Sequence, residues 1–481
     1  MTGMVLEELD ERELRETVPL WRTVFYAFGN AAGLLTYWTF NTYVQYFYTD
    51  VRGLPPHWVG RGWFAFGFWN AINDPVAGWL SDRTNTRWGR RRFYIGVLAV
   101  PTAVAFALVW LPPVELTNPT ALMVYFLVVI SIYDMLQSVI TLNQDALFPE
   151  MYHDTGNRAG GTSVRQLIGF LLGNGLAVAL TPQIYGKYGW GALAAMWGTL
   201  ASLMYLASLV GIRENRAYAQ QENPSLRDQV GVVVGNRTFL IVLFINFSTR
   251  FVLAVMLAIM PFYAEYVLGI ADEKLTSLLI ALLVSAGASL LVWQYVIRLY
   301  GTRTGMLISM VSAAACAVPL LFVQTIEATM VVLALLGFAI GGTVIGPDML
   351  FAEVVDDDYV RTGLRREGMY RGLLGFVYRL PPAVAGLILG ESLRQAGYNA
   401  DLTTQPETVG TVIRVFAAIL PQLAVVMGIG MLLAYPLYGS RLLDVQRRAA
   451  ALRRVTKSTA RERSPKKPNK MTLEPDLAGD R

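Results

Sequence analysis

Residues 70–92 read NAINDPVAGWLSDRTNTRWGRRR, an apolar run that contains a carboxylate and ends in a burst of arginine. Asp74 lies inside the run, where a charged side chain costs about 2.5 to 3.5 kcal/mol on membrane-insertion scales. A cluster of arginines directly after a span marks its cytoplasmic end. The stretch therefore predicts a membrane-spanning helix with a polar function, followed by a cytoplasmic loop.

The whole chain has the composition of a membrane protein. Of its 481 residues, 54% are hydrophobic and only 16% are charged, a balance that a soluble domain of this length does not easily keep in solution. Apolar stretches of helix-spanning length recur along the chain. They predict an all-α membrane protein with twelve transmembrane helices, near 22–49, 57–80, 93–112, 119–143, 160–184, 190–212, 238–268, 275–299, 304–324, 328–350, 369–391 and 412–438.

Loop charges predict how the chain is oriented. When alternate loops are assigned to opposite sides, one set carries sixteen Lys or Arg and the other carries five. The positive-inside rule places the richer set, and with it both termini, in the cytoplasm of a protein of the plasma membrane. The basic tail after residue 439 is expected to be disordered and to lie near anionic lipid, in preference to binding nucleic acid.

A polar connection divides the spans six and six. The predicted organisation is a cytoplasmic segment at 1–21, six-helix bundles at 22–212 and 238–438, a cytoplasmic linker at 213–237 between them, and the tail at 439–481. YFYTDVRGL at 46–54 also resembles FYAEYVLGI at 262–270, which aligns Gly53 with Gly269. A transporter built from two pseudo-repeats would leave such symmetry, with its binding site between the halves; chance similarity of two helix ends is the alternative.

Two polar groups suggest a cation site. Asn70 and Asp74 are four residues apart, so they share a helix face and offer oxygens from adjacent turns. Asp134, Ser138 and Thr141 form a polar stripe along another helix and are expected to face a cavity. The alternatives are a packing motif for the first pair and, for the stripe, a cation, a solute or only neighbouring helices.

Three arginines lie within predicted spans: Arg165, Arg250 and Arg379. An arginine inside a membrane protein either pairs with an acid or receives an anionic or hydroxyl-rich solute. The alternative is that Arg165 and Arg379 pair with Asp134 and Asp74 and only hold helices together. Tyr37 belongs to an aromatic-rich pair of helices on which a sugar ring could stack, although Tyr and Trp also favour membrane interfaces.

A separate group of charges suggests a gate. Ion pairs that break and re-form as access alternates would suit the basic side chains after the second helix and the acids of the tenth, including Glu353. The alternative is a hydrated loop with pairs worth about 0 to 1 kcal/mol each. The predicted gating residues are Asp82, Arg83, Arg90, Arg91, Asp356 and Arg366.

A membrane enzyme is the rival class. A magnesium-dependent prenyltransferase needs two clusters of spaced acids, which NDPVAGWLSD and VVDDDYV imitate only in part. The chain has two histidines and one cysteine, so it offers few of the side chains that zinc sites and nucleophilic catalysis use. We expect no enzyme activity and no cofactor or metal beyond a coupling sodium ion or proton.

Three motifs resemble one family, the glycoside-pentoside-hexuronide:cation symporters of the major facilitator superfamily. NDPVAGWLSDRTNTRWGRRR at 73–92 is similar to the family's helix two to three signature, and DDDYVRTGLRREGMYRGLLGFVYRL at 356–380 to its helix ten to eleven signature. ALFPEMYHDTGNRAGGTSVRQ at 146–166 is a weaker match. The resemblance implies two six-helix pseudo-repeats and a sugar, glycoside or sugar acid carried by cation symport through alternating access, by a monomer in the bilayer.

The resemblance also implies which residues form the binding sites and shows where this chain differs from the family's pattern. Asp74 and Ser138 match the family's cation site, but Asn70 stands where a second carboxylate belongs; Asp134 supplies a charge nearby. In the galactoside site, Asn30 and Thr141 replace two acids, Arg165 is kept and Arg379 stands for a lysine. Loss of two acids, together with the added Arg250, favours an anionic solute. An amphipathic, lysolipid-like solute is the alternative.

Overall fold

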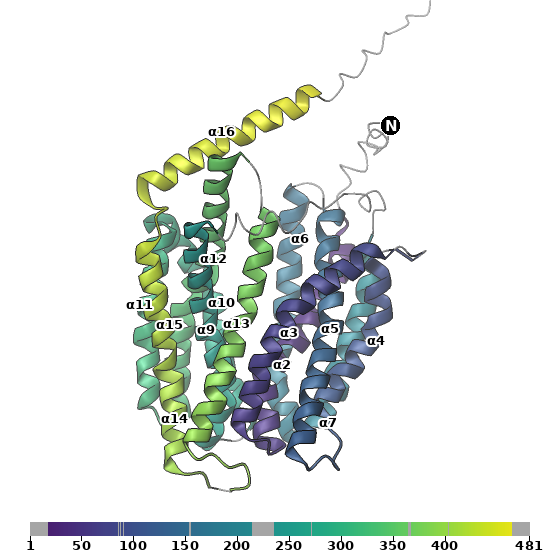
Figure 1. The fold of residues 1–481 in the computed structure, drawn as a ribbon, viewed down its shortest axis with the longest axis vertical. Coiled ribbons are helices and arrows are strands. Elements are labelled where there is room, and N and C mark those ends of the chain that lie inside the picture. The colour runs from purple at the N-terminus through teal and green to yellow at the C-terminus, as the bar shows by residue number, and fades with distance from the viewer. Residues whose placement is uncertain are drawn as a thin grey trace, which may run out of the picture.

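The computed structural model describes residues 18–84, 86, 88–89, 91–152, 155–213, 235–270, 272–363, 367–402 and 404–463. Within these residues every regular element is helical, and the helices form one upright bundle (Figure 1). The amino-terminal half contains α2 (Leu20–Tyr46) with a π-helical turn at Phe47–Val51, α3 (Pro56–Arg83), α4 (Arg91–Trp110), α5 (Pro119–Met151), α6 (Thr155–Ile168) with a π-helical segment at Gly169–Gly175, and α7 (Leu176–Gly211).

The carboxyl-terminal half repeats this plan. It contains α9 (Arg237–Tyr266), α10 (Asp272–Tyr300), α11 (Thr302–Ala317) with a 3₁₀ turn at Val318–Leu321, α12 (Ile326–Thr362), α13 (Glu367–Gln395), α14 (Glu407–Ala418) and α15 (Leu420–Ala434), followed by α16 (Gly439–Arg463). We call the end of the bundle that carries α16 the tail face, and the other end, where α14 begins, the opposite face (Figure 1).

Several helices begin where a polar side chain caps the free backbone N–H groups of the first turn. Asn118 Oδ1 accepts from the Thr120 N–H of α5 at 2.8 Å, and Asn236 Oδ1 accepts from the Thr238 N–H of α9 at 3.1 Å. Local sequence therefore fixes where these two spans start, on opposite sides of the bundle.

Nine described helical stretches are long and apolar enough to cross a membrane. The stretch Gly161–Gly211 counts as two crossings, because Gly189 takes a positive φ of 82° and the chain reverses there. Trp197 Nε1 donates to Thr181 Oγ1 at 2.8 Å, which shows that the two arms lie antiparallel. With α2 and α3, the described part of the chain makes twelve crossings, as the sequence predicts.

The two predicted repeats end their first helices in the same way. Gly53 and Gly269 both take positive φ values, 69° and 60°. The Leu54 N–H donates to the Tyr48 carbonyl at 2.9 Å, and the Ile270 N–H, 216 residues further on, donates to the Ala264 carbonyl at 3.1 Å. The backbone thus repeats the hydrogen bond as well as the glycine, which a chance likeness of aromatic residues would not require.

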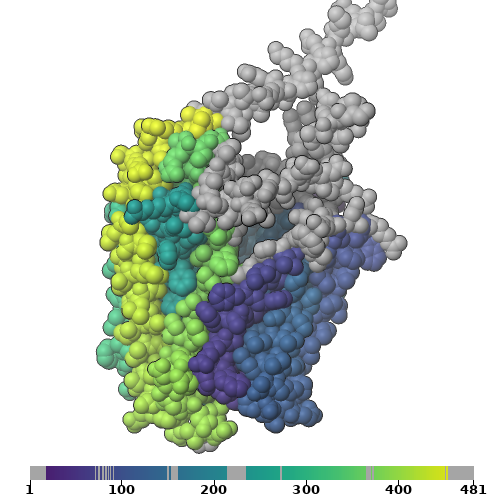
Figure 2. All heavy atoms as spheres, in the orientation of Figure 1, coloured from purple at the N-terminus to yellow at the C-terminus, as the bar shows by residue number. Residues whose placement is uncertain are grey.

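The halves approach each other closely through α3 and α13. A Cβ atom placed on Gly60 would lie 2.6 Å from the carbonyl oxygen of Gly386, so only glycine allows this approach. On the side of the molecule seen in Figure 2, the spheres of the two halves meet without a gap toward the opposite face. This contact closes one end of the space between the halves.

The structure corrects the prediction for the start of the tail. Residues 439–463 form helix α16 and are not disordered; the helix crosses the tail-face end of the carboxyl-terminal half (Figure 1). Val445 and Ala449, one turn apart, are 6% and 0% exposed and anchor it. The tail beyond residue 463, the segment 1–17 and most of the predicted linker, 214–234, lie outside the described residues.

Candidate functional site

A cavity of about 640 Å³ lies between the two halves. Its walls come from α2, α3, α5 and α6 on one side and from α9 and α13 on the other. Nine of the predicted cation- and solute-binding residues line it: Asn30, Tyr37, Asn70, Asp134, Ser138, Thr141, Arg165, Arg250 and Arg379. The side chain of the tenth, Asp74, lies outside the described residues. The polar stripe of α5 therefore faces a cavity, as its spacing predicts.

Oxygen atoms gather where α3 and α5 face each other. Asn73 donates from Nδ2 to Asp134 Oδ2 at 2.8 Å, which joins the two helices. Asn70 Oδ1 is buried and has no hydrogen-bond partner among the residues that the structure describes. A buried carbonyl oxygen without a donor is a feature that a bound cation or a solute hydroxyl would satisfy. Amide, hydroxyl and carboxylate oxygens of this kind are the ligands that hard cations prefer.

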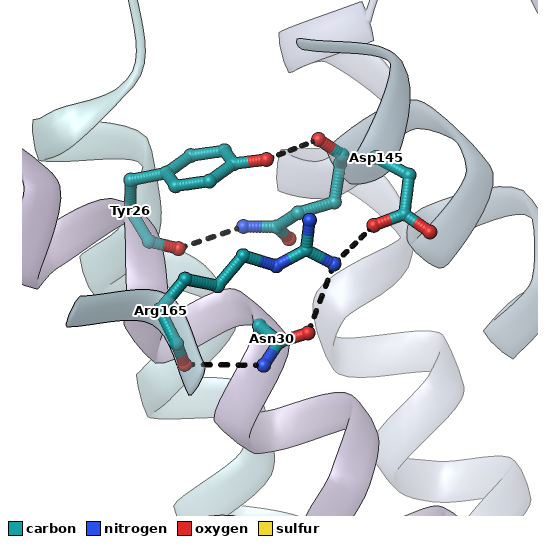
Figure 3. A network of polar contacts seen from close by, with 5 residues as sticks. Tyr26, Asn30, Asp145 and Arg165 are labelled. Carbon is teal, nitrogen blue, oxygen red and sulfur yellow. Dashed lines mark hydrogen bonds and ion pairs between the residues drawn. The ribbon is translucent and has the colours of Figure 1, made fainter. Parts of the chain in front are cut away.

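At the tail-face end of the cavity, Arg165 is held from two sides (Figure 3). Its Nη2 donates to Asn30 Oδ1 at 3.0 Å, while Asn30 Nδ2 donates to the Arg165 carbonyl at 3.4 Å. The same guanidinium forms an ion pair with Asp145, whose side chain is 49% exposed. The suggested pairing of Arg165 with Asp134 is therefore wrong: the acid that neutralises it lies three turns further along α5, nearer the tail face.

A second pair of hydrogen bonds supports this cluster. Tyr26 OH donates to the Gln144 carbonyl at 2.6 Å, and Gln144 Nε2 donates to the Tyr26 carbonyl at 3.1 Å (Figure 3). These bonds fix α2 against α5 next to Asp145. The two helices that carry Asn30 and Asp145, the partners of Arg165, are thus held in fixed positions beside the cavity.

Toward the opposite face, the cavity ends at aromatic side chains. Arg250 of α9 stacks on Tyr378 of α13, with its guanidinium carbon 3.5 Å from the ring centroid. Trp63 of α3 donates from Nε1 to the Pro382 carbonyl of α13 at 3.1 Å, across the two halves. Tyr37, 47% exposed, faces the same end. The cavity is polar at its centre and aromatic at this end.

Beyond the aromatic end, hydrogen bonds join the halves at the opposite face. Asp50 accepts from the hydroxyls of both Tyr266 and Tyr398. Tyr46 OH donates to Glu265 at 2.8 Å. Sequence reasoning missed these contacts, although the 216-residue offset already aligned position 50 with position 266. They seal the cavity at this face.

The predicted gate at the tail face is only partly visible. Arg90 and Arg366, and the side chains of Asp82 and Arg83, lie outside the described residues. Arg91 and Asp356 are half-buried. Glu353 does not take the predicted role of a loop partner. It is 7% exposed inside the carboxyl-terminal half, where it accepts from Thr302 at 2.6 Å and from Tyr435 at 2.8 Å.

Comparison with known proteins agrees with this architecture. The family model described as "MFS/sugar transport protein" matches residues 25–439. The isoprimeverose transporter of Lactiplantibacillus pentosus is 23% identical over 408 residues, which cover 80% of this chain and 82% of that protein. The sodium-dependent lysophosphatidylcholine symporter 1-A of Danio rerio is 21% identical over 477 residues, which cover 89% and 87%. These relatives are named as transporters, not enzymes.

A solved structure shows the same fold. The nucleoside transporter NupG superposes with a TM-score of 0.64 at 14% sequence identity, over 87% of this chain and 100% of that one. The family match spans most of the chain, and the described helices make twelve crossings around a cavity between two halves. The chain therefore belongs to the MFS/sugar transport protein family and is a multi-pass membrane transporter of the major facilitator fold.

Proposed function

We propose that the protein carries a sugar, a glycoside or a sugar acid across the membrane by cation-coupled symport. The observation that carries this proposal is the chemistry of the cavity. Amide and hydroxyl side chains line the cavity from its tail-face end to its centre, and aromatic rings line the other end: Asn30, Asn70, Gln137, Ser138 and Thr141, then Tyr37, Trp63 and Tyr378. Directional polar groups suit sugar hydroxyls, and flat rings suit the apolar faces of a pyranose.

The sealed opposite face supports alternating access as the mechanism. In this conformer Asp50 and its two tyrosine donors close one route out of the cavity, while the exposed Asp145 marks its end toward the tail face. Transport requires a second conformer in which these bonds are broken and the tail face is sealed. The hydrogen bonds between halves would then form in only one of the two states.

The coupling cation is assigned to the oxygens between α3 and α5. Asn70, Ser138 and Asp134 line the cavity there, and Asp74 is one turn from Asn70 on the same helix. A sodium ion on this set, or a proton on one of the carboxylates, would link solute binding to an ion gradient. The motifs that resemble the glycoside-pentoside-hexuronide:cation symporters favour the same assignment.

The remaining features follow from this proposal. The chain would work as a monomer in the plasma membrane, with the tail face in the cytoplasm, since that face carries the arginine-rich loops. Solute would then enter from outside and leave past Asp145. No nucleic acid and no further cofactor is needed.

A lysolipid-like solute is the second candidate, favoured by the sodium-dependent lysophosphatidylcholine symporter that resembles this chain over 89% of its length. An acyl chain needs a continuous apolar wall, whereas the lining of this cavity places amides, hydroxyls and charged side chains among its apolar residues. The lining thus favours the sugar class.

Uptake into proteoliposomes separates the two candidates. Purified protein is reconstituted and offered radiolabelled neutral glycosides, acidic glycosides and lysophosphatidylcholine under imposed sodium or proton gradients. Saturable glycoside uptake that falls in the cavity variant Asn30→Ala, but not in Arg298→Gln at the exposed end of α10, supports the proposal. Saturable uptake of lysophosphatidylcholine alone rejects it in favour of the second candidate.

A further inference from the structure

A small alcove of about 110 Å³ opens from the aromatic end of the cavity, between α2 and α3 of one half and α9 and α13 of the other. Arg250 and Tyr378 line both the cavity and the alcove and lie where the two spaces join. Leu253 and Leu257, on the same helix as Arg250, form an apolar wall of the alcove. Its volume suits a group of a few heavy atoms, not a whole sugar.

The charge of Arg250 is not neutralised by any carboxylate that the structure describes. Its one recorded contact is the face of Tyr378, 3.5 Å from the guanidinium carbon. Stacking fixes the plane of the guanidinium but leaves its N–H edge free to donate, because a ring face occupies none of the five donors. An arginine inside a membrane protein without a paired acid is a candidate binding site for an anionic or hydroxyl-rich solute, and its full positive charge favours the anion.

A second donor points to the same alcove. Gln45 of α2 lines it, and its side chain is only 5% exposed. Among the described residues its amide has no hydrogen-bond partner, and a Cβ on Gly386 would lie 2.8 Å from Gln45 Oε1. Gln45 lines the alcove, so its amide can donate to a ligand group that enters there. The glycine leaves the space that this amide occupies.

Arg165 does not offer a comparable site. Asp145 already neutralises its guanidinium, and Asn30 accepts from the same Nη2. An acidic solute group brought there would face the Asp145 carboxylate at close range. The two arginines at the two ends of the cavity therefore differ in what they can receive.

We propose that the alcove is an oxyanion subsite, in which Arg250 and Gln45 donate hydrogen bonds to a carboxylate, sulfonate or phosphate group of the transported solute. This inference rests on the proposed transport function and narrows it to an acidic sugar derivative. The aromatic and leucine walls are apolar and lower the local dielectric constant, which strengthens the attraction between the guanidinium and the anion. Because Gln45 and Arg250 belong to different halves, the bound acid also ties the halves together.

The experiment compares two ligands that differ only in the acid. Phenyl β-D-glucuronide and phenyl β-D-glucoside are titrated against purified protein in nanodiscs, with intrinsic tryptophan fluorescence as the signal, since Trp38 and Trp63 line the alcove. In Arg250→Gln, the ratio of glucuronide to glucoside affinity should fall about 10- to 100-fold, the range expected for lost hydrogen bonds to a charged group. Arg250→Lys should recover part of the ratio, and Arg298→Gln should keep it.

A second variant keeps the test independent of folding. Gln45→Glu preserves shape but places a carboxylate in the alcove, and it should lower glucuronide affinity more than glucoside affinity. An unchanged ratio in both Arg250→Gln and Gln45→Glu would overturn the subsite and leave sugar transport standing. An equal loss for both ligands in Arg250→Gln would assign Arg250 a structural role. Binding of lysophosphatidylcholine, with neither glycoside bound, would overturn both the subsite as stated and the proposed function.

Discussion

The hydroxyl of Tyr266 donates to the carboxylate of Asp50, and the two residues occupy equivalent positions, 216 residues apart, in the two halves. Each lies three residues before a glycine with positive φ, Gly53 or Gly269. The repeated helix ends therefore meet each other across the interface between the halves. The internal symmetry of the fold thus supplies both partners of the contact that seals the opposite face.

We expect Asp50→Ala to open that face. The variant removes the acceptor of two tyrosine hydroxyls, and hydrogen bonds to a charged group are worth about 1.5 to 3 kcal/mol each. The ratio of molecules sealed at this face to molecules open at it should fall by more than tenfold. Asn41 of α2 lines both the cavity and the alcove. An impermeant maleimide added from that side should label Asn41→Cys, in a Cys316→Ser background, at least several-fold faster.

Asp401→Ala is the matched control, because Asp401 is an exposed acid in the 396–406 connection on the same face. It should leave the labelling rate as it was. Equal labelling in Asp50→Ala and Asp401→Ala would show that the Asp50 contacts do not hold the seal.

Gly60→Ala tests the close approach of α3 and α13. The new Cβ would lie 2.6 Å from the Gly386 carbonyl, so the helices must separate, and overpacking of this kind costs about 1 to 3 kcal/mol. Thermal unfolding in detergent should shift down by a few °C. Gly430→Ala in α15, where no atom lies within 4 Å of the added Cβ, gains helix propensity without the clash and should not lower the midpoint. The same downward shift in both variants would refute the steric account.

Arg165 and Asn30 should act as a unit in solute binding. The Arg165 side chain donates to Asn30 Oδ1 at 3.0 Å, and Asn30 Nδ2 donates to the Arg165 backbone carbonyl at 3.4 Å. The side-chain bond is therefore lost in either variant, and Asn30→Ala removes the second bond as well. In a double-mutant cycle of Arg165→Ala and Asn30→Ala, the losses of binding free energy should fall short of additivity by about 0.5 to 3 kcal/mol. Isothermal titration calorimetry with the transported glycoside measures the binding free energy of each variant. Strict additivity would mean that the two residues bind solute independently.

Asn70→Asp should strengthen sodium coupling. The substitution converts a buried amide oxygen without a hydrogen-bond donor into a carboxylate, facing the same oxygens of α5. The sodium concentration for half-maximal uptake should fall about tenfold, while Asp74→Asn should abolish sodium dependence. Uptake assays over a sodium series at fixed pH provide the measurement. If Asn70→Asp left the sodium response unaltered, the cation site would have to lie elsewhere.

Composition and local pattern predict the fold and the lining of the cavity. Spans follow from runs of apolar residues, and residues such as Asp134 and Thr141 share a helix face because of their spacing, which needs no tertiary information. An arginine within a span must face the interior of the bundle, so Arg250 could be placed in the cavity from its position alone.

Pairings between distant positions could not be predicted in the same way. Tyr398 reaches Asp50 across 348 residues, and nothing in either neighbourhood specifies the other. Arg165 takes Asp145 as its partner instead of Asp134, because the choice depends on how far α6 is shifted along α5. The sequence did not predict the helix at 439–463, because the segment is basic overall and packs on the bundle through only two buried residues that we identify, Val445 and Ala449.

The most direct measurement of the central claim is the accumulation ratio of a transported glycoside in proteoliposomes with a clamped membrane potential. A potential of 100 mV supplies about 2.3 kcal/mol per charge moved, enough for roughly 50-fold accumulation of a neutral solute with one coupled cation. For a monoanionic glycoside the voltage contributions cancel, and accumulation should follow the chemical gradient of the cation alone. Cation-driven accumulation of glycosides with this difference between neutral and acidic members is the predicted result. Equilibration of every transported glycoside to equal concentrations, whatever the sodium or proton gradient, would contradict cation-coupled symport.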